Sequence, residues 1–129
     1  MSRVTNNDIF SKYFNVIELK HCDFKEKEGN LVVKSKKVNK NYNGICMFYS
    51  PNCDKCHRLV EKWNELGLFF TNKNICSVNC HDMKNKNNQL CDSMDVYKYP
   101  TIFNISIDGE LVKYVGRTSQ EDLFNELYM

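Results

Sequence analysis

The segment FYSPNCDKCH, from Phe48 to His57, carries two cysteines that are separated by two residues, and a histidine follows the second cysteine directly. This arrangement is compatible with three kinds of site: a redox-active dithiol, one half of a zinc site, and the attachment point of a c-type haem. The three need different structures around the cysteines. The elements on either side of Cys53 and Cys56 therefore decide between them.

A buried strand and an amphipathic helix are predicted on the two sides of this segment. GICMFY, at 44–49, is apolar almost throughout and short, which is typical of a strand buried on both faces. Apolar residues then recur with helical spacing as far as Leu66, and Gly67 supplies a stop, so we predict a helix over 53–66. Cys53 then lies at the helix N-terminus and Cys56 on its apolar face. This position favours a redox dithiol, because the free N–H groups and positive dipole end of a helix stabilise a thiolate.

The rest of the chain predicts a mixed α/β fold. We expect a helix at 6–14, a strand at 15–20, a hairpin or extended insertion at 22–42 and a strand at 74–80. A helix at 87–96, a hairpin at 101–115 and a closing helix at 118–127 are expected to follow. Gly29–Asn30 and Asp108–Gly109 supply the hairpin turns, and Thr118 with Glu121 forms a capping box for the last helix. The order predicts one sheet with helices on both faces, in which parallel strands come first and an antiparallel edge follows.

Four segments between Gly44 and Leu127 resemble the motifs of one family, in the same order. FYSPNCDKCH is similar to F-Y-A-P-W-C-x-x-C-K, and KYPT at 98–101 is similar to G-Y-P-T. The approach to KYPT, VNCHDMKNKNNQLCDSMDVY, and the closing YVGRTSQEDLFNEL have counterparts too. The chain thus resembles the thioredoxin superfamily, most closely the catalytic (a-type) domains of protein disulfide isomerases. The resemblance implies a thioredoxin-like fold in a single domain over 1–129, with a divergent N-terminal part at 1–43 and a redox core at 44–127.

The resemblance also implies an activity and assigns roles to residues. The activity is that of a thiol–disulfide oxidoreductase acting on protein thiols and disulfides, with Cys53 as the attacking and Cys56 as the resolving cysteine. Pro100 matches a cis-proline, and with its neighbours Tyr99 and Thr101 it would bind an extended substrate by strand addition. Arg117 matches an arginine that can ease the deprotonation of the resolving cysteine.

Two departures from the family pattern bear on this mechanism. Asn52 stands where the family usually has a tryptophan before the first cysteine, and Met47 stands where it keeps a buried acid as a proton acceptor. These departures lend some support to an alternative function, a redox-impaired interaction module with the same fold. The intact cysteine pair and the proline motif argue against it.

Metal and haem sites are the remaining alternatives. Cys76, Cys80 and His81 come near zinc-ligand spacing with the first cysteine pair. However, Cys76 and Cys80 flank the valine of a predicted core strand, whose alternate positions face opposite ways, so they cannot easily converge with a helix N-terminus. Haem attachment normally requires export, and we find no export signal. We therefore expect no metal and no organic cofactor, and we expect Cys46, Cys76 and Cys91 to be buried, inert thiols.

Length and charge set the remaining expectations. A chain of 129 residues with a net charge of +2 is the size of one domain, and it shows no nucleic-acid footprint. The lysine run KSKKVNK, at 34–40, is interpreted as a solvated loop. Without a signal peptide or an apolar segment of membrane-spanning length, we expect a cytoplasmic monomer with no membrane partner. Its expected partners are protein thiol or disulfide substrates and a redox partner.

Overall fold

The computed structural model describes residues 9–10 and 15–128, so most of the helix predicted at 6–14 lies outside the described residues. Five strands form a mixed sheet in the order β1 (Ile17–Glu18), β5 (Asn74–Asn79), β4 (Gly44–Tyr49), β6 (Thr101–Ile105) and β7 (Leu111–Lys113). β1 and β4 run parallel to β5, whereas β6 is antiparallel to β4 and β7 is antiparallel to β6. The predicted sheet, with parallel strands first and an antiparallel edge, is confirmed.

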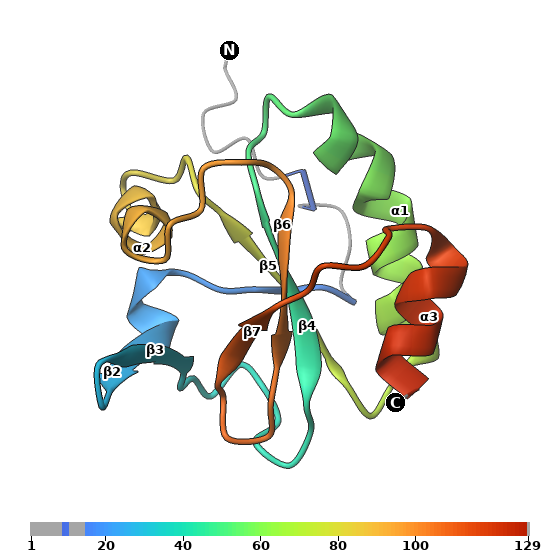
Figure 1. Ribbon diagram of the computed structural model, residues 1–129, viewed down its shortest axis with the longest axis horizontal. Helices are drawn as coiled ribbons and strands as arrows, with labels where there is room; N and C mark the ends of the chain where they lie inside the picture. Colours follow the sequence, from blue (N-terminus) through green and yellow to red (C-terminus); the bar gives the residue numbers. More distant parts are fainter. Residues whose placement is uncertain (1–8, 11–14, 129) are drawn as a thin grey trace.

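The two central strands carry the core and position the site. β4 and β5 are buried along their whole length, because helices and a small hairpin cover the two faces of the sheet (Figure 1). The apolar composition of β4 suits this double burial, whereas β5 also buries the polar Asn74, Ser77 and Asn79. The register of β4 with β6 pairs Phe48 with Thr101. The start of β6 therefore lies beside the end of β4, from which the cysteine motif follows.

The helices α1 (Asp54–Phe69) and α3 (Gln120–Tyr128) cover one face of the sheet (Figure 1). Their inward-facing residues, including Trp63 and Leu123, pack with Met47 of β4 in one apolar cluster. The fully buried Trp63 donates its indole N–H to the carbonyl oxygen of Cys76, at 2.8 Å. This bond satisfies a polar group that burial would otherwise leave unpaired, and it joins α1 to β5.

The ends of both helices differ from the prediction. α1 does not stop at Gly67 but continues to Phe69. A Cβ atom at Gly67 would lie 2.1 Å from the carbonyl oxygen of Asn15, so the glycine allows close packing and is not a terminator. At the start of α3, the side chain of Ser119 accepts the backbone N–H of Asp122, at 3.1 Å. The capping pair is therefore shifted by one residue from the predicted Thr118 and Glu121.

The opposite face is covered by α2 (Asn87–Ser93), the short 3-10 helix η1 (His21–Asp23) and the hairpin of β2 (Phe24–Lys27) and β3 (Asn30–Val33) (Figure 1). The hairpin confirms one of the two forms expected at 22–42, but its turn is formed by Glu28 and Gly29 and not by Gly29 and Asn30. Both turn residues have positive φ, at 54° and 87°, which matches the right-handed twist of the flanking strands.

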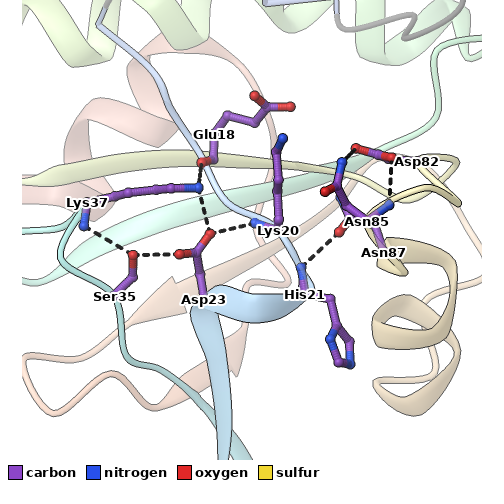
Figure 2. A network of polar contacts seen from close by, with 9 residues as sticks. All are labelled: Glu18, Lys20, His21, Asp23, Ser35, Lys37, Asp82, Asn85 and Asn87. Carbon is purple, nitrogen blue, oxygen red and sulfur yellow. Dashed lines mark hydrogen bonds and ion pairs between the residues drawn. The ribbon is translucent and has the colours of Figure 1, made fainter.

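A polar network holds η1 between the lysine run and α2 (Figure 2). The Asp23 carboxylate accepts hydrogen bonds from Lys37 Nζ at 2.8 Å, Ser35 Oγ at 2.6 Å and the Lys20 backbone N–H at 2.8 Å. Next to it, the His21 backbone N–H donates to Asn87 Oδ1 at 2.8 Å. Burial raises the pKa of Asp23, but the hydrogen bonds and the Lys37 charge outweigh it, so that the pKa lies below its ordinary value.

Candidate active site

The two cysteines of the motif lie where β4 ends and α1 begins. Cys53 is the N-cap residue of α1, and its sulfur accepts the backbone N–H of Cys56 at 3.1 Å. Cys53 is partly exposed, whereas Cys56 is buried in the apolar cluster beneath α1. The predicted placement, with one cysteine at the helix start and the other on its inner face, is confirmed. A sulfur in this position interacts with the free N–H groups of the first helical turn.

Backbone hydrogen bonds hold the turn that presents Cys53. The Cys53 N–H donates to the Ser50 carbonyl at 3.1 Å, and the Cys53 carbonyl accepts the N–H of His57 at 3.1 Å, which starts the helix. The exposed His57 ring donates through Nε2 to the Pro51 carbonyl, at 2.6 Å. Pro51 itself has no N–H to satisfy in this turn. The orientation of Cys53 is therefore set by the residues on both sides of it.

The proline loop faces the first cysteine. The Tyr99–Pro100 peptide bond is cis, in agreement with the family resemblance. The Cys53 thiol donates to the Tyr99 carbonyl oxygen at 3.4 Å, although the two residues are 46 positions apart in the chain. Thr101 is buried at the start of β6, and its hydroxyl donates to the Lys98 carbonyl, which fixes the loop from within. The structure thus brings Cys53, Tyr99 and Pro100 together, as the pairing of β6 with β4 requires.

The second cysteine is in an environment that opposes its ionisation. The pKa of Cys56 is raised to about 12, mainly because burial disfavours the thiolate. The hydrogen bond with Cys53 and the charge of Cys53 also raise this pKa, whereas backbone hydrogen bonds at Ser50 and Cys56 lower it. The Met47 side chain belongs to the same apolar cluster as Cys56 and cannot accept a proton. Burial also raises the pKa of Tyr99, and the charges of Asp92 and Cys56 add to this shift.

Arg117 is not joined to the cysteines. Its side chain is exposed, and in the part of the chain that the structure describes no hydrogen bond or ion pair links it to Cys53 or Cys56. Its backbone carbonyl accepts the Tyr114 hydroxyl. The charge of Arg117 is also not among the causes that shift the pKa of Cys56. An effect of Arg117 on the resolving cysteine would therefore need a movement of its side chain.

One expectation about the remaining cysteines is wrong. Cys91 is not a free thiol but forms a disulfide with Cys80, with a Cα–Cα distance of 5.8 Å. The bond joins the residue after β5 to the inner face of α2, and both of its cysteines are buried. The sequence held a signal for it, because Cys80 ends a predicted strand and Cys91 faces inward on the next helix. Cys46 and Cys76 are buried and free as expected, and burial raises the pKa of both thiols.

The candidate zinc ligands do not come together in the structure. Cys76 is buried in the cluster beneath α2, on the opposite face of the sheet from Cys56. Cys80 is bonded to Cys91. Within the described residues, no three side chains of His, Cys, Asp or Glu come together as a metal site. In the same part of the chain, no helix has the length and apolar character that a membrane span needs.

Sequence comparisons relate the chain to known proteins. The family model described as Thioredoxin matches residues 15–128. A protein disulfide-isomerase of Datisca glomerata is 32% identical over 80 residues, which make up 62% of this chain and 16% of that protein. Protein disulfide isomerase-like 1-1 of Arabidopsis thaliana is 27% identical over 88 residues, or 68% of this chain and 17% of that protein. The chain thus spans about one sixth of the length of these curated relatives.

Structural comparisons agree with the sequence matches. ERdj5, in the crystal structure of its form II, superimposes with a TM-score of 0.70 at 27% identity, over 92% of this chain and 14% of that one. The J-Trx1 fragment of ERdj5 superimposes with a TM-score of 0.67, also at 27% identity, over 94% of this chain and 56% of the fragment. The thioredoxin-like arrangement of sheet and helices is therefore found over nearly all of the chain.

Proposed function

This chain belongs to the thioredoxin family, and on that premise we propose that it is a thiol–disulfide oxidoreductase acting on protein thiols and disulfides through Cys53 and Cys56. The observation that carries the proposal is the placement of a partly exposed Cys53 sulfur at the start of α1, with Cys56 buried behind it. The resemblance to disulfide isomerases supports an oxidoreductase type of activity. That its substrates are protein thiols and disulfides is a further step of the proposal, beyond the type of activity.

The proposed reaction transfers two electrons in two exchange steps. The Cys53 thiolate attacks one sulfur of a substrate disulfide; the substrate S–S bond breaks, and a mixed disulfide forms as one substrate thiolate leaves. Cys56 then loses its proton and attacks the Cys53 sulfur. The mixed disulfide breaks, the second substrate thiolate leaves and takes up a proton, and Cys53 and Cys56 end as a disulfide. The reverse sequence would oxidise a substrate dithiol.

We propose that the Tyr99, Pro100 and Thr101 segment binds the substrate chain. Tyr99 supports this role because its backbone carbonyl lies beside the attacking sulfur, where an extended chain placed along the loop would meet it. The Thr101 hydroxyl is engaged with Lys98, so Thr101 would contribute by holding the loop. Asn52 is exposed next to the attacking cysteine and would contact the same substrate.

The proton of Cys56 needs an acceptor in the second step. Neither Met47 nor the described position of Arg117 supplies one, so we propose that water or a leaving thiolate accepts it. Arg117 retains the role proposed from the family motif, which is to ease deprotonation after its side chain moves toward the site. In that case Arg117→Ala should slow the decay of the mixed disulfide and leave its formation unchanged.

The cellular setting is also a proposal. The sequence predicts a cytoplasmic location. The monomeric state, the absence of nucleic-acid partners and the division of residues 1–129 into a divergent part at 1–43 and a core at 44–127 stay predictions, which we keep. The Cys80–Cys91 disulfide weighs against the cytoplasm, because disulfides persist mainly in oxidising compartments. We therefore favour an oxidising compartment, in which the reverse sequence would oxidise a substrate dithiol to a disulfide and a redox partner would then re-oxidise the Cys53 and Cys56 thiols.

The reduction of insulin by dithiothreitol, with and without the protein, tests the proposed activity. Cys53→Ser should abolish catalysis, whereas Cys56→Ser should accumulate mixed disulfides, which non-reducing electrophoresis would show as higher bands. Cys22→Ser is the matched control, because Cys22 is an exposed thiol outside the motif and should not matter. Full activity of Cys53→Ser would overturn the proposal. A folded wild-type protein without activity would favour the interaction module.

A further inference from the structure

A second feature of the surface lies far from the cysteines. An open pocket of about 750 Å³ is formed by the β2–β3 hairpin, the segment 34–42 and the turn that follows β6. Figure 1 shows that segment and the β6–β7 turn at one end of the sheet, and the start of α1 at the other. A volume of this size is ordinary for a ligand site. The dithiol chemistry makes no use of it.

Positive charge dominates this pocket, which we call the lysine pocket because five lysines line it: Lys25, Lys27, Lys34, Lys36 and Lys40. All five are exposed, and within the described part of the chain none of their side chains takes part in an ion pair or a hydrogen bond. Asp108 is the single carboxylate of the lining. Five ammonium groups against one carboxylate leave a local excess of positive charge, which attracts anions.

The wall that carries three of these lysines is held in place. Lys37, within the run, donates to Asp23 at 2.8 Å and to the Glu18 carbonyl at 3.2 Å (Figure 2). Further along, Asn39 exchanges hydrogen bonds with the buried Asn74 side chain, at 2.9 Å in both directions. Between them, Val38 packs against the core. The lysine run is therefore not merely a solvated loop, as the sequence suggested, but the wall of a defined pocket.

The chemistry of the lining indicates the kind of ligand. Val32, Val38 and Ile107 line the pocket among the lysines, so the ligand would combine negative charge with an apolar side chain. Lysines on flexible stems suit carboxylates spread along a chain, whereas a single phosphate is held better by the planar fork of arginine, which is absent from the lining. Tyr42 is the only aromatic side chain of the lining, which gives nucleic-acid bases little to stack on.

We propose that the lysine pocket binds an acidic peptide segment of a partner protein, with an aliphatic side chain on the apolar lining and carboxylates on the lysines. The site would hold a partner without taking part in thiol exchange. The inference does not depend on the proposed function, because binding can be measured without the cysteines reacting.

Fluorescence anisotropy with the full chain tests this inference. The probe is a fluorescein-labelled peptide of repeated Glu-Glu-Leu, compared with the same peptide in Gln-Gln-Leu form. The acidic peptide should bind, and the affinity should fall as salt is added. Lys34→Glu combined with Lys36→Glu should weaken binding by about tenfold or more, because two attractive contacts become repulsive. Both lysines are exposed and unpaired, so the double variant should keep the wild-type circular dichroism and melting temperature.

The matched control is Lys84→Glu combined with Lys113→Glu, which changes the net charge equally at exposed positions outside the pocket. This variant should bind the acidic peptide as the wild type does. Equal weakening by both double variants would show attraction to overall charge and overturn the proposal. Absence of binding of the acidic peptide would overturn it too. So would tighter binding, at the same lysines, of a fluorescein-labelled single-stranded oligonucleotide, or of inorganic phosphate used as a competitor, than of the acidic peptide.

Discussion

The buried Cys56 thiol leads to a prediction about the pH dependence of mixed-disulfide decay. Only the thiolate attacks, and burial is the main cause of the pKa of about 12. A mixed disulfide at Cys53 removes the hydrogen bond and the charge of that residue, which also raise the pKa, but not the apolar cover of Cys56, which is the largest cause. With a pKa near this value, the thiolate fraction at pH 7 is on the order of 10⁻⁵ and rises about tenfold per pH unit. The decay rate should therefore rise by about 10³ from about pH 6 to about pH 9, without a plateau.

Changing Met47 tests the physical reason for this profile. Met47→Glu would place a carboxyl group in the apolar cluster with Cys56, where burial raises its own pKa toward neutrality and makes it an effective proton acceptor. At pH 7 the decay should accelerate by about 10²-fold, and the pH profile should flatten. Met47→Gln is the matched control, since it has the same shape and polarity but no base. Burying either polar side chain should lower stability by on the order of a few kcal/mol.

Stopped-flow mixing with Ellman's reagent measures both steps. The first release of the coloured thiol reports the attack by Cys53, and the second reports the decay of the mixed disulfide by Cys56. A Cys22→Ser background removes the exposed thiol that would add to the signal. A rate that levels off by about pH 9 would mean that Cys56 ionises with a pKa no higher than that of an ordinary thiol, about 8.5. Equal acceleration by Met47→Glu and Met47→Gln would mean that polarity, and not proton transfer, controls the step. Either result would refute the reasoning.

Three further predictions concern stability. Replacing Cys80 and Cys91 together by serine opens a loop with a sequence separation of 11, which should lower the free energy of unfolding by about 3 kcal/mol in urea titrations; an unchanged midpoint would contradict this. The pKa of Asp23 is lowered in the folded state, so its contribution to stability is present above its unfolded pKa and is lost as pH falls through that value and below. When the free energy of unfolding is measured at decreasing pH, Asp23→Asn should therefore lose less stability than the wild type. Gly67→Ala should cost about 1–3 kcal/mol, because the added methyl would meet the Asn15 carbonyl; thermal melting checks this, and an unchanged melting temperature would speak against the packing described.

Much of the fold and of the site could be predicted from local patterns. The apolar run of β4 and the helical period of α1 are properties of short segments, and together they place Cys53 and Cys56 correctly. The structure differs from the sequence prediction where neighbouring alternatives are locally equivalent. Gly67 can end a helix or allow close packing, and only the position of Asn15 decides which it does. The turn lies at Glu28 and Gly29, one residue before the predicted pair, and the two positions are locally equivalent in the same way.

Contacts between segments far apart in the chain could not be read from such patterns. Composition and periodicity determine which faces are apolar, and hence that a sheet forms with helices on both sides. They do not determine which thiols come within bonding distance or which lysines share a pocket, because those distances depend on how whole elements pack. The docking of α2 against β5 pairs Cys80 with Cys91 and leaves Cys46 and Cys76 free. The anchoring of Lys37 to Asp23 in the same way fixes a polar run, which by sequence resembles a loose loop, as the wall of a pocket.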